Sequence, residues 1–254
     1  MEIKEMASVL KLSYIREHHD LLLNEATHLD LSHKDFLSMT LEREMERRNQ
    51  NGVNRRIRKA KFPVRKYMED FVKEKYEPEV RRKFAEIETM QFVDNKENII
   101  LIGIPGSGKT HYATAIGIKA CIEGKSVLFS SVPNLVIELK EAMSLNQITN
   151  YKKKFEKYDL VILDELGYIS FDKEGCEILF NLLSNRNDKG SIIITTNLTF
   201  DRWEEVFKDT MLTGAIVDRL AHKAHILDMS IEVSYRLEET LNWLKRPIRE
   251  VAES

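Results

Sequence analysis

The chain has 254 residues, 43% of them hydrophobic, which is enough to bury one large core or two modest ones. With 39 Lys and Arg against 41 Asp and Glu, the net charge is only −2, so nucleic-acid binding would have to rest on local clusters of basic residues. No signal-peptide pattern opens the chain and no apolar run approaches transmembrane length. We therefore expect a cytoplasmic protein without a membrane partner.

Two helices are predicted at the start of the chain. Apolar side chains recur at helical spacing over residues 3–29 and predict an amphipathic helix. A second helix should run from about residue 34 to 61, with Ser32 as its N-cap and Asp35 near its positive end. Gly52 is expected to break or kink this second helix. The side chains expected to face inward on it are Phe36, Leu37, Leu41 and Met45.

A strongly basic run occupies residues 43–66, where ten Lys and Arg side chains are balanced only by Glu44 and Glu46. Charge runs usually mark a solvated helix face. Here the scarcity of acidic neighbours and the excess of Arg, which suits bidentate phosphate contact, favour nucleic-acid binding instead. The predicted DNA contacts in this run are Arg47, Arg48, Arg55, Arg56, Arg58, Lys59 and Lys61. Lys152 and Lys153 form a second candidate patch, for which a solvated helix face is an equal alternative.

The rest of the chain has the pattern of a covered α/β sheet. Residues 67–93 look helical, and from residue 98 onward apolar strands alternate with helices, as in parallel sheets with crossover helices. We therefore predict a small all-helical domain over 1–70, which holds the basic segment, and an α/β domain over 71–254 with a C-terminal helical extension. The predicted strands are 99–102, 127–130, 160–163, 192–195 and 225–229, and the predicted helices lie near 109–122, 133–144, 148–157, 173–187, 210–221 and 235–246.

A phosphate-binding loop is predicted between the first strand and the helix that follows it. The sequence Gly-x4-Gly-Lys-Thr ends at Thr110, so backbone N–H groups of the turn and the helix N-terminus would converge on an anion. Lys109 would reach the β- and γ-phosphates, and the Thr110 hydroxyl would ligate Mg²⁺. The predicted nucleotide-binding residues are Gly103, Pro105, Gly106, Ser107, Gly108, Lys109, Thr110 and His111.

Acidic and polar residues at two further strand ends predict hydrolysis. Asp164 and Glu165 follow an apolar strand, where Asp164 would hold Mg²⁺ and Glu165 would polarise the water that attacks the γ-phosphate. Asn197 ends a strand expected between those of the phosphate loop and Asp164, and it would orient the same water. Arg219, on the outward face of a helix, is a candidate arginine finger for a neighbour's nucleotide. Arg236 is a weaker candidate for sensing nucleotide in its own subunit.

Together these motifs resemble those of DnaC/IstB-type AAA+ ATPases over about residues 95–240. The basic N-terminal segment and residues 209–226 are similar to IstB transposition helpers rather than to replicative helicase loaders, which remain the alternative. One departure is the tail, because IstB proteins often stop soon after the last strand, whereas this chain continues to Ser254. The segments that carry the resemblance are Gly103–Ala113, Leu163–Glu165, Thr195–Asn197, Val217–Leu220 and Ser234–Arg236.

The resemblance implies an AAA+ sheet of five parallel strands in the order 5-1-4-3-2, with ATP and Mg²⁺ as ligands. It also implies homo-oligomers assembled through the ATP sites on duplex DNA, which they remodel or bend, and a transposase from the same insertion sequence that stimulates ATP hydrolysis. A largely sequence-independent choice of DNA fits a segment rich in Arg. A nucleotide-switched scaffold with little turnover is a further alternative, which Glu165 disfavours because a pure switch needs no base.

Overall fold

The computed structural model describes residues 2–186, 188–231 and 235, and it divides into two compact units, Met1–Arg58 and Lys59–Ser254. The boundary predicted at residue 70 thus falls earlier. The reason is that the segment after Lys59 packs on the second unit. Ala60 is completely buried, and its carbonyl accepts a hydrogen bond from the Phe129 N–H at 2.8 Å.

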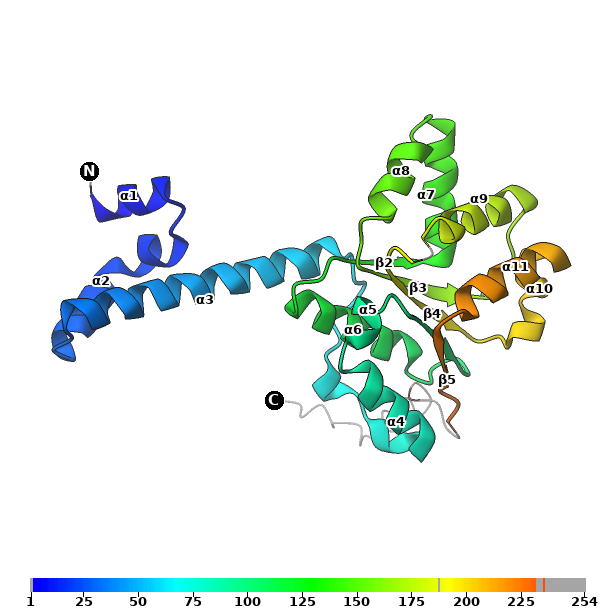
Figure 1. The fold of residues 1–254 in the computed structure, drawn as a ribbon, viewed down its shortest axis with the longest axis horizontal. Helices are drawn as coiled ribbons and strands as arrows, with labels where there is room; N and C mark the ends of the chain where they lie inside the picture. The colour runs from blue at the N-terminus through cyan, green and yellow to red at the C-terminus, as the bar shows by residue number, and fades with distance from the viewer. Residues whose placement is uncertain (1, 187, 232–234, 236–254) are drawn as a thin grey trace, which may run out of the picture. The chain divides into compact units, whose positions relative to one another are not determined.

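The first unit is helical, as predicted, and consists of α1 (Ile3–Val9), α2 (Ser13–His28) and α3 (His33–Lys59), whose last residue belongs to the second unit (Figure 1). The single helix expected over residues 3–29 is two helices, because the chain turns at Lys11, whose φ is +56°. α3 begins with the predicted cap, in which Ser32 Oγ accepts from the Asp35 N–H at 3.2 Å. It continues through Gly52 without the expected break.

The inward face predicted for α3 is wrong at three positions. Leu37, Leu41 and Met45 are exposed, because α3 instead buries a face that includes Thr40 and Glu44. The Glu44 carboxylate accepts hydrogen bonds at 2.9, 2.7 and 3.2 Å from the backbone N–H groups of three consecutive residues at the start of α2, namely Ser13, Tyr14 and Ile15. The N-cap position of α2 is Leu12, which offers no side-chain acceptor, so Glu44 supplies the cap from another helix.

The second unit begins with short elements where one long helix was expected over residues 67–93. These are the 3-10 helices η1 (Met68–Asp70) and η2 (Lys73–Lys75), followed by α4 (Pro78–Ile87) and α5 (Gln91–Asp94). Extended backbone at Phe71 and Tyr76 separates the first three elements. The reason is tertiary packing, since Phe71, Tyr76, Phe84 and Tyr112 form a buried aromatic cluster with neighbouring ring centroids 4.4–5.5 Å apart.

The sheet confirms the predicted topology. Its five parallel strands have the order β2-β3-β4-β1-β5, which is the expected 5-1-4-3-2 counted from the other edge. The strands are β1 (Asn98–Ile102), β2 (Val127–Ser131), β3 (Leu160–Leu166), β4 (Ser191–Thr196) and β5 (Ala224–Asp228). Each begins or ends within about three residues of its prediction, because buried parallel strands read as continuous apolar runs.

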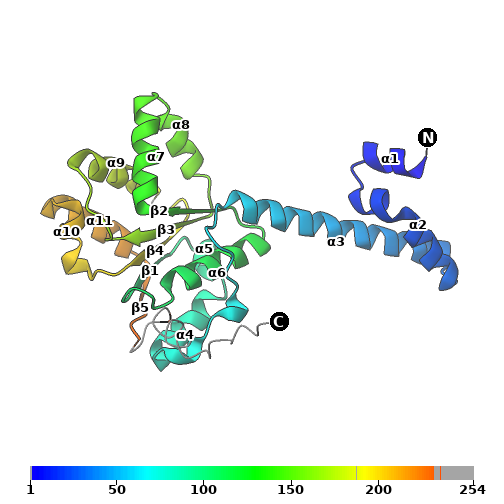
Figure 2. The same cartoon turned by 180° about the vertical axis from the view of Figure 1, so that it is seen from behind.

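Helices cover both faces of this sheet (Figures 1 and 2). α6 (Lys109–Ile122) packs on one face, and α7 (Val132–Ser144), α9 (Lys173–Ser184) and α11 (Thr210–Ala221) pack on the other. The remaining elements are α8 (Ile148–Phe155), η3 (Phe200–Arg202) and α10 (Glu204–Phe207). The helix predicted near 235–246 lies outside the described residues. Within the described part of the chain, no helix is both long and apolar enough to cross a bilayer.

A buried arginine, Arg186, connects three elements of this unit through its hydrogen bonds. Arg186 has no exposed surface, and its guanidinium donates to the carbonyls of Phe155, Tyr158 and Ser191 at 2.8, 2.6 and 3.2 Å. Burial lowers the pKa of Arg186 to about 10. The side chain therefore joins the end of α8 to the starts of β3 and β4, a role for which the sequence contains no local signal.

Candidate nucleotide-binding site

The predicted phosphate loop connects β1 to α6 and forms one wall of a cavity of about 590 Å³. Gly106 and Gly108 have φ values of +80° and +89°, which L side chains rarely adopt. A Cβ atom on Gly108 would also lie 2.6 Å from the Tyr76 hydroxyl and 3.2 Å from the Phe71 ring. The aromatic cluster behind the loop therefore leaves room only for glycine at position 108.

Two polar side chains of the loop are suited to receive phosphate. Lys109 is buried, and its Nζ donates to the carbonyls of Gly103 and Ile104 at 2.7 and 2.8 Å, which holds the ammonium group inside the loop. The Ser107 hydroxyl is buried and has no hydrogen-bond partner within the described part of the chain. The Tyr76 hydroxyl donates to the Ser107 carbonyl at 2.5 Å, and burial raises the pKa of Tyr76. The Tyr76 hydroxyl thus stabilises the backbone of the loop, and Ser107 and Lys109 line the cavity.

The two predicted magnesium ligands lie side by side. Thr110 Oγ1 donates to the carboxylate oxygens of Asp164 at 2.9 and 3.2 Å, although the two residues come from different elements, α6 and β3. A hydroxyl and a carboxylate are hard oxygen donors of the kind that Mg²⁺ prefers. The donor set therefore fits this ion next to the phosphate loop.

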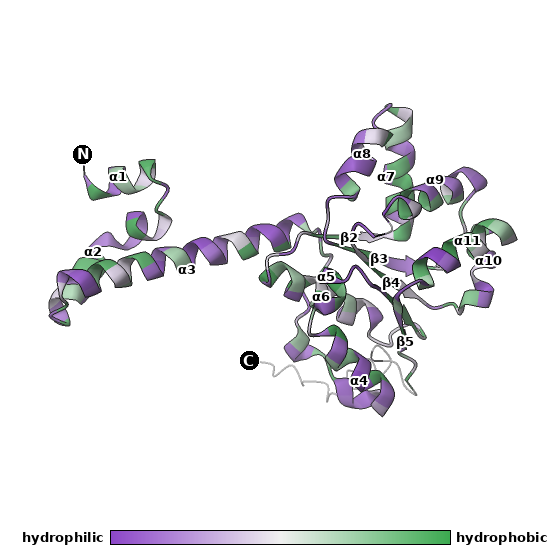
Figure 3. Cartoon of the chain, viewed as in Figure 1, coloured by the Kyte–Doolittle hydropathy of each residue, from purple (hydrophilic) through white to green (hydrophobic). Residues whose placement is uncertain are grey.

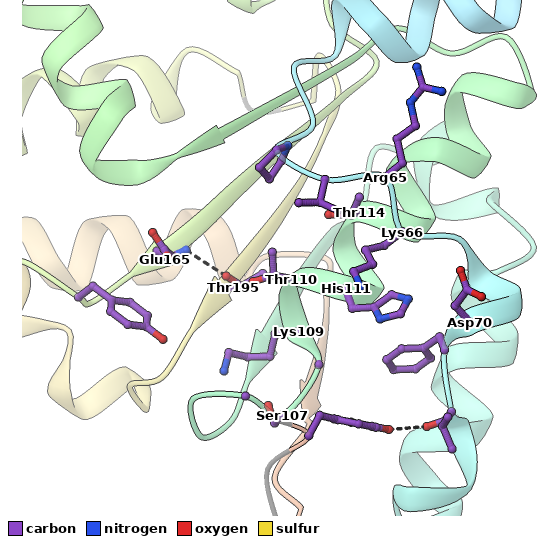
Figure 4. Close-up of a pocket in the computed structure, with 18 residues that line it drawn as sticks. Arg65, Lys66, Asp70, Ser107, Lys109, Thr110, His111, Thr114, Glu165 and Thr195 are labelled. Atoms are coloured by element: carbon purple, nitrogen blue, oxygen red, sulfur yellow. Dashed lines mark hydrogen bonds between the residues drawn. The ribbon is translucent and has the colours of Figure 1, made fainter. Parts of the chain in front are cut away.

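Glu165 lines the same cavity with an unusual backbone. Its φ is +64°, and the pairing register between β3 and β4 shifts between Leu163 and Leu166, so Glu165 lies in a bulge. Its N–H donates to Thr195 Oγ1 at 3.0 Å. Figure 4 shows Glu165 and Thr195 on one side of the cavity, His111 and Lys66 on the other, and Lys109 and Thr110 between them. The predicted base thus lines the same cavity as Lys109 and Thr110, and Asp164 contacts Thr110.

Not every predicted residue lines this cavity, because Gly103, Pro105 and Asp164 are absent from its described lining, although Asp164 contacts Thr110. Asn197 is not among the described residues that line it, and its Oδ1 is buried without a partner in the described part of the chain. Arg219 is exposed on α11, with its guanidinium over the Phe180 ring, 4.7 Å from the ring centroid. Arg236 lies outside the described residues. The roles predicted for Asn197, Arg219 and Arg236 therefore stay predictions.

One wall of the cavity was not predicted from the sequence. It is formed by residues 63–66 and 70–72, and it includes Arg65 and Lys66, which the sequence analysis counted in the basic run. His111 Nε2 lies 3.2 Å from the Tyr67 carbonyl and joins this wall to α6. Only Pro63, just after the basic helix, signals a chain that stops being helical, and nothing local shows that the segment returns to the phosphate loop.

The predicted DNA contacts of α3 fall into two groups. Arg47 pairs with Glu17 at 2.8 Å, and Arg48 donates to the Lys11 carbonyl at 3.4 Å, so α1 and α2 with their connection supply partners that were missing from the run itself. Arg55 and Arg58 are exposed and have no ion pair within the described residues. Hydrophilic residues predominate along this second half of α3 (Figure 3). Arg55 and Arg58 therefore have the side chains most available to an external anion.

Basic side chains also meet on the second unit. Lys61 and Lys154 line the same small hollow, together with Glu138 and Tyr151. Lys61 pairs with Glu138 at 3.3 Å, and the Tyr151 hydroxyl donates to Glu138 at 2.7 Å. The predicted contacts Lys152 and Lys153 precede Lys154 on α8. The tertiary structure thus brings two of the basic segments together, although Glu138 offsets part of their charge.

Comparison with known proteins links this site to insertion sequences. A family model described as IstB-like ATP binding protein matches residues 5–242. The chain is 37% identical over 239 residues to a protein of Pseudomonas aeruginosa named for ATP binding in insertion sequence IS21, covering 94% of this chain and 89% of that protein. It is 33% identical to the corresponding IS232 protein of Bacillus thuringiensis, covering 91% and 92% of the two chains.

Solved structures support the same fold. The crystal structure of the DnaC helicase loader matches with a TM-score of 0.50 and 22% identity, over 62% of this chain and 94% of that one. The crystal structure of DnaI matches with a TM-score of 0.55 and 20% identity, over 66% and 91%. AMPPCP-bound DnaA from Aquifex aeolicus matches with a TM-score of 0.54 and 18% identity, over 75% and 58%. At these identities the likeness concerns the AAA+ fold.

Proposed function

Because the chain belongs to the family of IstB-like ATP-binding proteins, we propose that it is an ATP-hydrolysing helper of transposition. In this proposal it binds ATP with Mg²⁺ and assembles into homo-oligomers on duplex DNA, which it remodels or bends. It then recruits the transposase of the same insertion sequence, which stimulates hydrolysis. The support for this context is that relatives aligned over about nine-tenths of the chain are named as ATP-binding proteins of insertion sequences.

The observation that carries the proposal is that Lys109, Thr110 and Glu165 line one cavity, while Asp164 contacts the Thr110 hydroxyl directly. Lys109 and the loop N–H groups would bind and orient the phosphates, and Thr110 and Asp164 would hold Mg²⁺. When bound, this ion supplies positive charge that neutralises the phosphate oxygens. Glu165 would accept the proton of the attacking water, which a nucleotide switch without turnover does not require.

The position of Arg219 supports a composite site in which a neighbour completes the catalytic group. An exposed arginine outside its own cavity can act as a finger only on another subunit's nucleotide, which requires a head-to-tail interface. Arg219→Ala should therefore bind ATP normally but hydrolyse it about 1,000-fold more slowly. The control is Arg202→Ala, which removes an exposed arginine already paired with Glu205.

Mixing two inactive variants separates action in trans from action in cis. In an equal mixture of Arg219→Ala and Glu165→Gln, about a quarter of the interfaces would combine an intact Glu165 with a neighbour's intact Arg219, so that fraction of wild-type activity should return. If steady-state hydrolysis stays at the level of the separate variants, the trans assignment is wrong.

The experiment that tests the DNA-binding part of the proposal measures filter retention of duplex DNA in ATP as a function of salt. Arg55→Ala combined with Arg58→Ala should weaken binding to all sequences and reduce the slope of log K against log salt by about two. Arg47→Ala is the matched control, and because Glu17 already holds Arg47, it should change the slope by less than about one.

Competition with single strands in the same assay separates the helper from a helicase loader. Duplex DNA should displace the labelled duplex at lower concentration than single strands do. A preference for single strands would favour the loader alternative. An unchanged salt slope in the Arg55→Ala, Arg58→Ala variant would show that these side chains of α3 do not contact DNA.

A further inference from the structure

The bulge at the end of β3 interrupts the pairing of β3 with β4, and the side chain of Thr195 on β4 contacts the residues of the bulge. Leu163 pairs with Ile194 and Leu166 with Thr196, so two residues of β3, Asp164 and Glu165, lie opposite Thr195 alone. A bulge of this kind removes regular ladder hydrogen bonds and leaves backbone groups to be satisfied in another way. Here the affected residues are the predicted metal ligand and the predicted base.

The Thr195 hydroxyl satisfies one of these backbone groups and also binds a side chain of the bulge. Its oxygen accepts the hydrogen bond from the Glu165 N–H at 3.0 Å, and its proton is donated to Asp164 Oδ1 at 2.5 Å. Thr195 is only 2% exposed and has a single hydroxyl proton, so its only donor is committed to Asp164. One buried hydroxyl thus fixes the left-handed backbone of Glu165 and the orientation of the Asp164 carboxylate at the same time.

We propose that Thr195 is the positioning residue of this site, which holds Asp164 toward the metal position and Glu165 toward the attacking water. This inference rests on the proposed hydrolytic function and deepens it. Asn197, for which the sequence pattern predicts the polar role at this strand end, is not among the described residues that line the cavity, whereas Thr195 is. Removing the hydrogen-bond partner of a metal ligand typically lowers metal affinity or activity by about 10- to 100-fold.

The test compares Thr195→Val, which keeps the shape and removes the hydroxyl, with Thr195→Ser, which keeps the hydroxyl. Thr195→Val should lower kcat for ATP by about 10- to 100-fold and raise the half-saturating Mg²⁺ concentration for binding of a fluorescent ATP analogue severalfold. Its binding of that analogue in saturating Mg²⁺ should stay within about twofold of wild type. Thr195→Ser should restore kcat and the Mg²⁺ dependence to within about threefold of wild type.

Thr196→Val is the control for a merely structural role. Thr196 is equally buried on β4, and its hydroxyl accepts from the Leu198 N–H at 3.1 Å rather than contacting the carboxylates. This variant should lose thermal stability to the same extent as Thr195→Val without a change in Mg²⁺ dependence. If Thr195→Val retains the wild-type Mg²⁺ dependence and kcat, the inference is overturned. A Thr195→Ser variant whose kcat and Mg²⁺ dependence depart from wild type by more than about threefold also overturns it. This comparison does not require the valine variant to fold.

The same measurements distinguish failure of this inference from failure of the proposed function. A wild-type protein that binds the analogue with Mg²⁺ but shows no hydrolysis with DNA and transposase present would contradict the proposed function. The Mg²⁺ dependence of analogue binding would still test the role of Thr195 in that case.

Discussion

Replacing Glu165 with Gln is expected to lower the steady-state rate of ATP hydrolysis by about 100- to 10,000-fold while ATP binding is kept. The amide has nearly the shape of the carboxylate and fits the same bulge, but it cannot accept a proton from water. Because Glu165 belongs to β3 and not to the loop that would bind the phosphates, affinity for a fluorescent ATP analogue should change by less than about threefold. The rate is measured with and without long duplex DNA.

The second consequence of Glu165→Gln concerns the assembly. If hydrolysis dismantles the DNA-bound oligomer, the variant should remain on duplex DNA in ATP much longer than wild type, as followed by dissociation into competitor DNA. The control is Glu141→Gln, which changes an exposed carboxylate on α7 outside the cavity and should leave both measurements unchanged. Rapid dissociation of the Glu165→Gln complex from DNA would contradict the role of hydrolysis in disassembly. A wild-type rate of ATP hydrolysis in this variant would show that Glu165 is not the base.

Replacing Glu44 with Ala should unfold the N-terminal unit at lower temperature and denaturant concentration. The change leaves the first N–H groups of α2 without their acceptor in a nearly closed site, where Glu44 is only 4% exposed. Loss of a cap with charge-assisted hydrogen bonds should lower the free energy of unfolding by about 3 kcal/mol. The buried apolar residues of this unit are few, namely Ala7, Leu22, Val53 and Ile57, so that loss is a large part of its stability.

Circular dichroism of the full chain during heating measures this effect, and DNA retention and ATP binding report on the two units separately. DNA binding should fall in Glu44→Ala, while affinity for the ATP analogue should stay within about twofold of wild type. Glu46→Ala is the matched control, because Glu46 is exposed two residues further along the same helix and should change stability by less than about 0.5 kcal/mol. Equal effects of the two substitutions would show that the three hydrogen bonds to Glu44 contribute little.

Much of the second unit could be predicted because its signals are local. The apolar runs of β1, β3 and β4 each mark a buried strand, and the glycines and Lys109 mark the loop that follows β1. In a parallel sheet the carboxyl ends of neighbouring strands meet at one edge, so Thr110 and Asp164 were expected to lie together and do. The family resemblance added the strand order, which periodicity alone does not determine.

The errors arose where one segment satisfies the polar groups of another. Glu44 was counted as a surface charge that balances the basic run, and its part in α2 depends on a turn at Lys11 that no apolar pattern indicates. The helix predicted over residues 67–93 was confirmed only in its second half. In the first half, burial of Phe71 and Tyr76 behind the phosphate loop outweighs local helix propensity. Such contacts join residues that are far apart in the chain.

The sequence by itself determined the chemistry proposed for this protein, because the phosphate loop, the candidate metal ligands and the candidate base each lie within a few consecutive residues. Only the tertiary structure decided how that chemistry is held. It placed Thr195 opposite the bulge of Asp164 and Glu165, and it lined the cavity with residues 63–66 and 70–72. The physical reason is that a hydrogen bond is satisfied by whichever partner the folded chain brings within reach, and sequence spacing does not show that partner.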